Sequence, residues 1–224
     1  MKNIFGVSSE MSANQKLKNG YTMYDWVMRQ KCFPAFWGRT LLGDNPITKE
    51  EIEFLKQRDC KIALIVRDFD EADICYNNGN NDAIRIMNAA KALGVPQNQG
   101  IALFIDVNPE WSIDHNWMQS YARTLYANGY VAGFIGNTDS SKNFNFDRHT
   151  SHFVQGTAGE NRCGTIFCAT EPKLNDMPEK WEPYCPSALN PEDIHLWACD
   201  KTSFDNFEVI DVYAQNDDVL NCMW

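Results

Sequence analysis

The sequence has no long apolar run. A membrane-spanning helix needs roughly 20 consecutive apolar residues, whereas the runs at Lys61–Val66 and Ile101–Val107 are short and have charged residues close by. The start of the chain, Met1–Ser8, also lacks the apolar stretch and cleavage site of a signal peptide. We therefore expect no membrane partner. The localisation stays open between the cytoplasm and release or export without a classical signal.

Positive charge is scarce relative to negative charge. Twenty Lys and Arg residues stand against thirty Asp and Glu residues, which gives a net charge of −10. This balance opposes general binding to nucleic-acid backbones and to anionic membrane surfaces. We expect no nucleic-acid partner, and the oligomeric state stays open.

Recognised metal and cofactor motifs are absent. The sequence contains no CxxC pair, no HExxH helix, and neither of the glycine-rich nucleotide-binding signatures. His149 and His152, with Asp147 nearby, have a spacing that matches no known metal motif. The eight cysteines are scattered, which favours free thiols, several of them buried as small apolar groups. We expect no metal and no cofactor.

Short β-like runs alternate with helix-like stretches along the whole chain. The predicted strands are Ile4–Ser8, Phe33–Gly38, Lys61–Val66, Ile101–Val107, Tyr130–Ile135, Cys163–Ala169, Ile194–Cys199 and Glu208–Tyr213. The predicted helices are Tyr21–Lys31, Thr48–Arg58, Asn81–Leu93, Trp111–Asn128 and a weaker one around Arg148–Gln155. Eight such units predict an α/β fold, a single compact (β/α)8 TIM-type barrel spanning residues 1–224 as one domain.

Local signals refine this prediction. Thr48 is a plausible N-cap with Glu51 at the capping-box position, and Gly94 and Gly129 are expected to end two helices. The segment Glu171–Asp193 is rich in proline, so we expect shortened or irregular outer helices in the C-terminal third.

The active site of such a barrel lies at the carboxyl ends of its strands. Asp106 ends an apolar central strand, and strand alternation is expected to point its side chain into the barrel mouth. Further carboxylates that could share the chemistry are Glu10, Glu110 and Asp211. Asp106 is the strongest candidate, and its alternative is a structural hydrogen bond to loop amides. Asp211 could be a structural hydrogen-bond partner, and Glu10 and Glu110 could as easily be solvated.

Candidate substrate-binding residues follow from the same rule. They are Trp37, Arg39, Asp68, Asn108, Asn137, Trp197, Tyr213 and Gln215. Paired carboxylates and flat aromatic rings suit a site that cleaves sugars. Arg39 could instead form a structural ion pair, and the tryptophans could pack at the rim.

Several segments in order resemble the bacterial glycoside-hydrolase-like TIM barrels of poorly defined function, which are related to the lysozyme-type muramidases of family 25. The resemblance rests on Gly6–Ser8, Ala35–Arg39, Asp82–Pro96, Ile101–Asn108, Gly129–Gly136, Leu196-Trp197 and Ile210-Asp211. It implies acid catalysis on N-acetylated cell-wall sugars.

The sequence departs from the muramidase pattern at two places. In those relatives the fourth strand ends Asp-x-Glu and the first strand carries an Asp. Asp106 matches the first acid, but Asn108 stands at the Glu position and Ser8 or Ser9 at the first-strand Asp position. Asn cannot act as a general acid, so Glu110 or a substrate-assisted route would have to serve.

Three functions therefore stay open. The first is a glycoside hydrolase that acts on a cell-wall-type or N-acetylated glycan. The second is a catalytically inactive barrel that binds glycan, and the third is another hydrolase or a scaffold on the same common fold.

Overall fold

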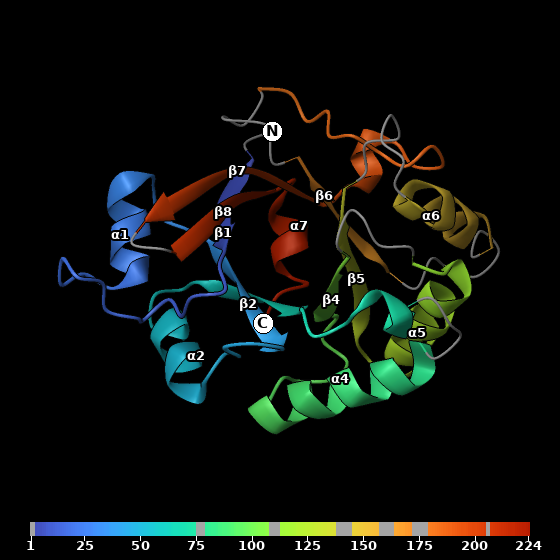
Figure 1. Ribbon diagram of the computed structural model, residues 1–224, viewed down its shortest axis with the longest axis horizontal. Coiled ribbons are helices and arrows are strands. Elements are labelled where there is room, and N and C mark those ends of the chain that lie inside the picture. The colour runs from blue at the N-terminus through green and yellow to red at the C-terminus, as the bar shows by residue number, and fades with distance from the viewer. Residues whose placement is uncertain are drawn as a thin grey trace.

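Eight strands close into one barrel in the order in which they occur along the chain (Figure 1). This computed structural model describes residues 3–74, 79–107, 113–137, 145–156, 164–171, 179–204 and 207–224. The strands are β1 (Ile4–Ser8), β2 (Phe36–Leu42), β3 (Lys61–Val66), β4 (Ala102–Asp106), β5 (Val131–Gly136), β6 (Ile166–Thr170), β7 (Leu196–Phe204) and β8 (Phe207–Ala214). The predicted TIM-type barrel is confirmed.

Helices pack around the outside of this barrel (Figure 1). They are α1 (Met23–Gln30), α2 (Lys49–Lys56), the short α3 (Glu71–Ile74), α4 (Gly79–Leu93), α5 (His115–Ala127) and α6 (Asn145–Gly156). Between β6 and β7 the described residues contain only a short 3-10 helix, η1 (Pro191–Asp193). The expectation of irregular outer helices in the C-terminal third therefore holds for the described part of that segment.

Strand β8 departs from the (β/α)8 pattern. Strands β1 to β7 are parallel to their successive neighbours, whereas β8 pairs antiparallel with both β7 and β1. The reason is the connection: β7 ends at Phe204 and β8 begins at Phe207, and a parallel crossover needs a dozen or more residues. The carboxyl end of β8 therefore lies at the opposite end of the barrel from those of the other strands.

The core has two layers separated by the strands. Alternate strand residues such as Phe36, Phe104 and Val212 fill the inside of the barrel. Their neighbours along the strands, such as Trp37 and Trp197, belong to the outer layer. Because a strand has a period of two, the layer that a side chain joins is fixed by its position along the strand.

The C-terminal segment closes the amino end of the barrel. Trp224 and Ile62 exchange two backbone hydrogen bonds, of 2.8 and 3.0 Å. Met223 is buried against the inner layer, and α7 (Asp217–Leu220) lies across the middle of the barrel as seen in Figure 1. The carboxyl end of the seven parallel strands is thereby left as the open mouth.

The helix-end signals are confirmed in part. The Thr48 side chain accepts a hydrogen bond from the Glu51 backbone N–H, as an N-cap does, and Gly94 and Gly129 have φ angles of 88° and 76°. The predicted capping box does not form, however, because the Glu51 carboxylate bonds to Arg39 and to the Ala13 N–H instead.

Two further expectations concern the thiols and the helices. Within the described residues Cys60, Cys168, Cys185 and Cys222 are free thiols, and Cys60, Cys168 and Cys199 are buried. Cys75 and Cys163 lie outside those residues. None of the described helices combines the length and the apolar character that a bilayer crossing requires.

Candidate active site at the barrel mouth

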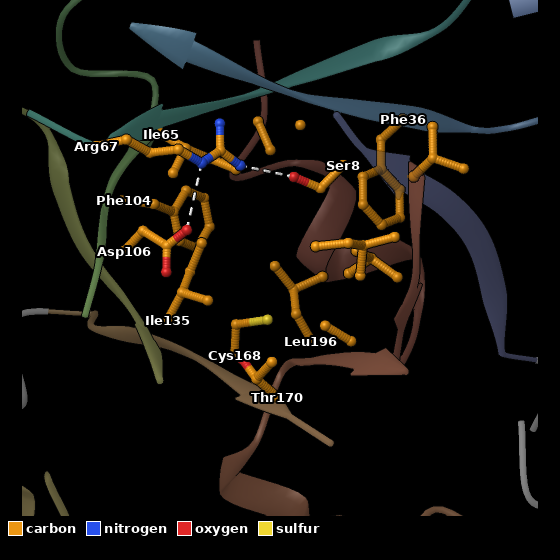
Figure 2. Close-up of a pocket in the computed structure, with 16 residues that line it drawn as sticks. Ser8, Phe36, Ile65, Arg67, Phe104, Asp106, Ile135, Cys168, Thr170 and Leu196 are labelled. Atoms are coloured by element: carbon orange, nitrogen blue, oxygen red, sulfur yellow. Dashed lines mark hydrogen bonds and ion pairs between the residues drawn. The ribbon is translucent and has the colours of Figure 1, made fainter. Parts of the chain in front are cut away.

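Asp106 is the last residue of β4 and points into the barrel mouth. Phe104 and Ala102, two and four residues before it, belong to the inner layer, so strand alternation places the Asp106 side chain above them. The side chain is 37% exposed. The carboxyl group therefore forms part of the floor of the mouth while remaining open to a ligand (Figure 2).

Arg67 contacts three side chains from three strands. As the first residue after β3, it places its Nε 3.3 Å from Asp106 Oδ2. Its two terminal nitrogens donate to Thr40 Oγ1 on β2 and Ser8 Oγ on β1, each at 2.8 Å. Figure 2 shows the guanidinium between Ser8 and Asp106. The position of Arg67 is thus fixed independently of Asp106.

Opposing effects set the pKa of Asp106. Burial of the carboxyl group raises the pKa above its usual value, and the negative charge of Glu10 raises it further, while the Arg67 guanidinium lowers it by charge and by hydrogen bonding. The net result is a raised pKa. A carboxyl group that keeps its proton to higher pH is better suited to act as an acid.

A pocket of about 440 Å³ lies above these residues. Its lining includes five carboxylate or amide residues, and the full set is Ser8, Ser9, Glu10, Met11, Asp44, Asn45, Arg67, Asp106, Phe207, Glu208 and Ile210. A smaller, mostly apolar cavity of about 120 Å³ extends from it into the barrel. The two share Ser8, Arg67, Asp106 and Ile210, so the polar mouth leads into an apolar interior.

Among the residues predicted to be catalytic, Glu10 joins Asp106 in lining this pocket. Its side chain is exposed, and its backbone oxygen accepts hydrogen bonds from Arg39 at 2.8 Å and from Asn45 at 2.6 Å. Ser9 Oγ donates to the Glu208 backbone oxygen at 2.9 Å. These bonds hold the segment after β1 against β2 and β8 and so fix the base of the Glu10 side chain.

Arg39 lies behind the mouth and forms a structural ion pair. It is fully buried, its Nε donates to Glu51 Oε1 at 2.7 Å, and Glu51 is equally buried. Its terminal nitrogens bond to the backbone oxygens of Ser9, Glu10 and Asn45. Of the two roles predicted for Arg39, the geometry is that of the ion pair.

The two tryptophans predicted at strand ends lie near strand starts. Trp37 is the second residue of β2 and Trp197 the second of β7, and both rings are buried. Trp37 stacks on Tyr24 with ring centroids 5.7 Å apart, and Trp197 meets Trp181 edge-on at 5.5 Å. Both strands extend beyond their predicted ends, so the two tryptophans lie near the strand starts and away from the mouth.

The antiparallel direction of β8 corrects the predicted positions of Tyr213, Gln215 and Asp211. Tyr213 pairs with Phe5 and Trp197 near the amino ends of β1 and β7, and Gln215 follows at the same end of the barrel. Asp211 points into the outer layer, where its Oδ2 lies 2.5 Å from Lys31 Nζ. None of these three residues lines the mouth pocket.

The remaining candidates are spread around the barrel. Asp68 follows β3 but bonds to Arg85 at 2.5 Å, outside the mouth pocket. Asn137 directly follows β5, also outside the residues that line the pocket. Asn108 and Glu110 lie outside the described residues.

The sequence prediction passed over Arg67, Ser8, Thr40 and Glu208 as site residues. Arg67 and Ser8 stand at strand ends, and the same rule that selected Asp106 covers them. Thr40 lies inside β2, and Glu208 reaches the mouth only because β8 runs antiparallel. For Glu208, the direction of β8 was the missing piece of information.

Comparison with solved structures shows the fold. An uncharacterised B. stearothermophilus protein matches with a TM-score of 0.79 and 22% identity, over 99% of this chain and all of that one. The Mycobacterium tuberculosis Tat-secreted protein Rv2525c, in complex with HEPES, matches with a TM-score of 0.56 and 14% identity over 93% of each chain. The Clostridium perfringens spore cortex lytic enzyme SleM has a TM-score of 0.49 and 10% identity, over 95% of this chain and 67% of that one. No protein-family profile and no curated protein sequence matches this chain.

Proposed function

We propose that this protein is a glycoside hydrolase that cleaves an N-acetylated, cell-wall-type glycan at the barrel mouth, with Asp106 as the general acid. One observation carries the proposal. The Asp106 carboxyl group has a raised pKa at the floor of a pocket of about 440 Å³, which Glu10 also lines. Two carboxyl groups in different environments are what glycoside hydrolysis requires.

The roles follow from the surroundings of each carboxyl group. Asp106 donates its proton to the glycosidic oxygen as the bond from that oxygen to the anomeric carbon breaks. The exposed Glu10 carboxylate faces the positive charge that develops on the sugar. Water then adds its hydroxide to the anomeric carbon and returns a proton to Asp106, so the site is restored. Asp106 thus takes the general-acid part that the Asn108 departure removes from the muramidase pattern, and Glu10 supplies the second carboxylate.

Arg67 is a positioning residue in this scheme. It holds the Asp106 carboxyl group by one oxygen, Oδ2, at 3.3 Å. Ser8 and Thr40 fix the guanidinium from the other side. Because Arg67 lowers the pKa of Asp106 while burial and Glu10 raise it, the balance lets the acid give up its proton and recover it.

The apolar cavity below Asp106 supports an N-acetylated substrate. Ala63, Ile65 and Phe104 are among its lining residues, and its volume is about 120 Å³. A methyl group that enters such a space leaves water for apolar contacts, worth about 0.8 kcal/mol for each buried carbon. The acetamido methyl of an N-acetylated sugar is of the right size and polarity.

The test is release of new reducing ends from purified peptidoglycan and from chitin oligosaccharides. The wild type is expected to form product, and Asp106→Asn to lower kcat at least about 100-fold, the size of a lost acid–base group. Glu10→Gln should also lower kcat. Glu53→Gln, which removes an exposed carboxylate on α2, is the matched control and should leave the rate unchanged.

A second function is favoured by the Arg67–Asp106 ion pair, in which the guanidinium already engages one oxygen of the carboxyl group at 3.3 Å. It is glycan binding without cleavage. With Trp37, Trp197 and Tyr213 away from the mouth, the ring available among the residues lining the larger pocket is Phe207. Absence of product together with glycan binding that Phe207→Ala weakens would favour this function over hydrolysis.

A further inference from the structure

Three potential metal ligands from two neighbouring helices meet on the outside of the barrel. Asp114 and His115 stand at the start of α5, and His149 lies on α6. One ligand atom from each of the three lies within 4.8 Å of the other two. Helices α5 and α6 lie side by side (Figure 1), so the cluster joins residues 34 positions apart. This is why the sequence spacing alone predicted no metal site.

The Nδ1 atom of His115 in this cluster is available to bind a metal ion. His115 Nδ1 is buried, and within the described structure it has no hydrogen-bond partner. It lies 3.6 Å from Asp114 Oδ1. A buried ring nitrogen without a partner is costly unless something binds it. The oxygen and nitrogen are also close to the spacing of about 3.4 Å that two ligands of a tetrahedral zinc ion have.

The two N–H groups that face the His149 ring cannot both donate a hydrogen bond to it. The His115 backbone N–H points at His149 Nδ1 at 3.3 Å, and an Arg148 nitrogen lies 3.0 Å from His149 Nε2. A neutral imidazole accepts at one nitrogen only, so one of these contacts is not a hydrogen bond. Arg148 is exposed and can turn into solvent, and Nε2 then binds a metal ion once the ring proton sits on Nδ1 and the contact with the His115 N–H is given up.

We propose that Asp114, His115 and His149 form a binding site for a divalent transition-metal ion of the zinc class. Two imidazoles and one carboxylate are ligands that Zn²⁺, Co²⁺ and Ni²⁺ favour over Mg²⁺ and Ca²⁺. All three residues are partly exposed, so an ion can enter and keep a water molecule as a further ligand. Asp114 already has the place of its side chain fixed, because its Oδ1 caps α5 by accepting from the Asn116 N–H at 2.7 Å.

The bound ion would link the first turn of α5 to α6. Since these helices cover neighbouring parts of the barrel wall, binding to the folded chain should stabilise it. The inference stands apart from the proposed hydrolase, because none of the three ligands lines the mouth pocket. Loss of glycan cleavage and loss of metal binding are therefore separate results.

The experiment titrates the untagged full chain, freed of metal by a chelator, with Co²⁺ and with Zn²⁺. Cobalt held by nitrogen and oxygen ligands absorbs in the visible range but lacks the strong near-ultraviolet band of cobalt–thiolate bonds. We expect visible absorption that saturates at one ion per chain without that ultraviolet band, and Zn²⁺ should displace the Co²⁺. A thiolate band would assign the metal to the cysteines and overturn the proposal.

Variants locate the ion. His149→Gln and His115→Gln should each weaken Co²⁺ binding at least tenfold, and Asp114→Asn should weaken it while keeping an oxygen for the α5 cap. His195→Gln is the matched control, because His195 is the one histidine outside the group formed by His115, His149 and His152, and it should leave the affinity unchanged. Zn²⁺ should raise Tm by several degrees for the wild type and the control but not for His149→Gln. Equal affinity in all variants, or no saturable binding, would overturn the site.

Discussion

Arg67 Nε lies 3.3 Å from Asp106 Oδ2, while the two other nitrogens of the same guanidinium make shorter bonds of 2.8 Å to hydroxyl groups. The hydroxyls of Ser8 and Thr40 thus hold the arginine, and the arginine in turn faces the aspartate. Strands β1, β2 and β4 are connected through one side chain. Arg67, whose position is set by Ser8 and Thr40, therefore lowers the pKa of Asp106, whereas burial, the largest effect, raises it.

Replacing Arg67 should raise the pKa of Asp106 further. The guanidinium lowers this pKa, whereas burial and Glu10 raise it, so Arg67→Met removes the main opposing effect. The ¹³C shift of the Asp106 carboxyl carbon, assigned with Asp106→Asn, should titrate at higher pH in Arg67→Met than in the wild type. Arg67→Lys keeps the positive charge and should lie between the two. An unchanged or lower midpoint in Arg67→Met would contradict the electrostatic assignment.

Removing the charge of Glu51 should destabilise the fold strongly. Arg39 and Glu51 are both fully buried and bonded at 2.7 Å, so Glu51→Gln leaves a buried guanidinium without its counter-charge. Breaking such a pair costs about 3–5 kcal/mol. Denaturant unfolding, monitored by tryptophan fluorescence, measures the change in the free energy of unfolding.

The matched control for this pair is Arg85→Gln. Its partner is Asp68, and the two side chains are 42% and 27% exposed, so the loss should stay below about 1 kcal/mol. If Glu51→Gln cost no more than Arg85→Gln, the buried pair would contribute little to the fold.

Glu51 also shows where sequence reasoning about local structure stops. The Thr48-x-x-Glu51 spacing predicted a capping box, and the Thr48 half of it is present. The carboxylate instead turns to Arg39, twelve residues earlier on β2. A buried guanidinium attracts a carboxylate more strongly than a backbone N–H does, and no local pattern reveals that partner.

The barrel and the position of Asp106 could be predicted because they depend on local patterns. Apolar runs with period two, separated by helix-like stretches, were enough to indicate eight strands and the direction of the Asp106 side chain. The direction of β8 depended on the length of one connection. The predicted strand bounds, Cys199 and Glu208, already leave fewer residues than a parallel crossover needs, so an antiparallel β8 was predictable from the sequence. Tyr213 and Gln215 were assigned to the mouth for this reason, whereas Asp211 also lies on the outward face of β8.

A side chain at Gly133 should disturb the inner layer. A Cβ atom there would lie 2.2 Å from the Phe104 ring, and Phe104 is part of the packed interior. Gly133→Ala should therefore lower the free energy of unfolding by about 1–3 kcal/mol, as overpacking does. The measurement is thermal or denaturant unfolding.

Gly100→Ala separates overpacking from backbone strain. Gly100 has a φ of 70° and nothing within 4 Å of an added Cβ, so alanine there meets only the strain of the left-handed region, about 1 kcal/mol. The Phe104 ring should also change its NMR shifts in Gly133→Ala but not in Gly100→Ala. Equal losses without a change at Phe104 would show that the interior tolerates the methyl group.

His195 should make the stability of the fold depend on pH. Its Nδ1 accepts a hydrogen bond from the Phe167 N–H at 3.2 Å, and burial lowers its pKa below the usual value of 6.5, an effect that Asp193 partly offsets. The unfolded chain therefore binds this proton more readily than the folded chain. The stability that His195 contributes is present above about pH 6.5 and is lost as the pH falls below it.

His195→Asn keeps an acceptor but does not titrate, so the difference in unfolding free energy between wild type and variant should shrink from pH 8 to pH 5, by an amount on the order of 1 kcal/mol. Because the other titrating groups are common to both proteins, a difference that stayed constant or grew toward pH 5 would mean that the His195 ring accepts its proton in the folded state.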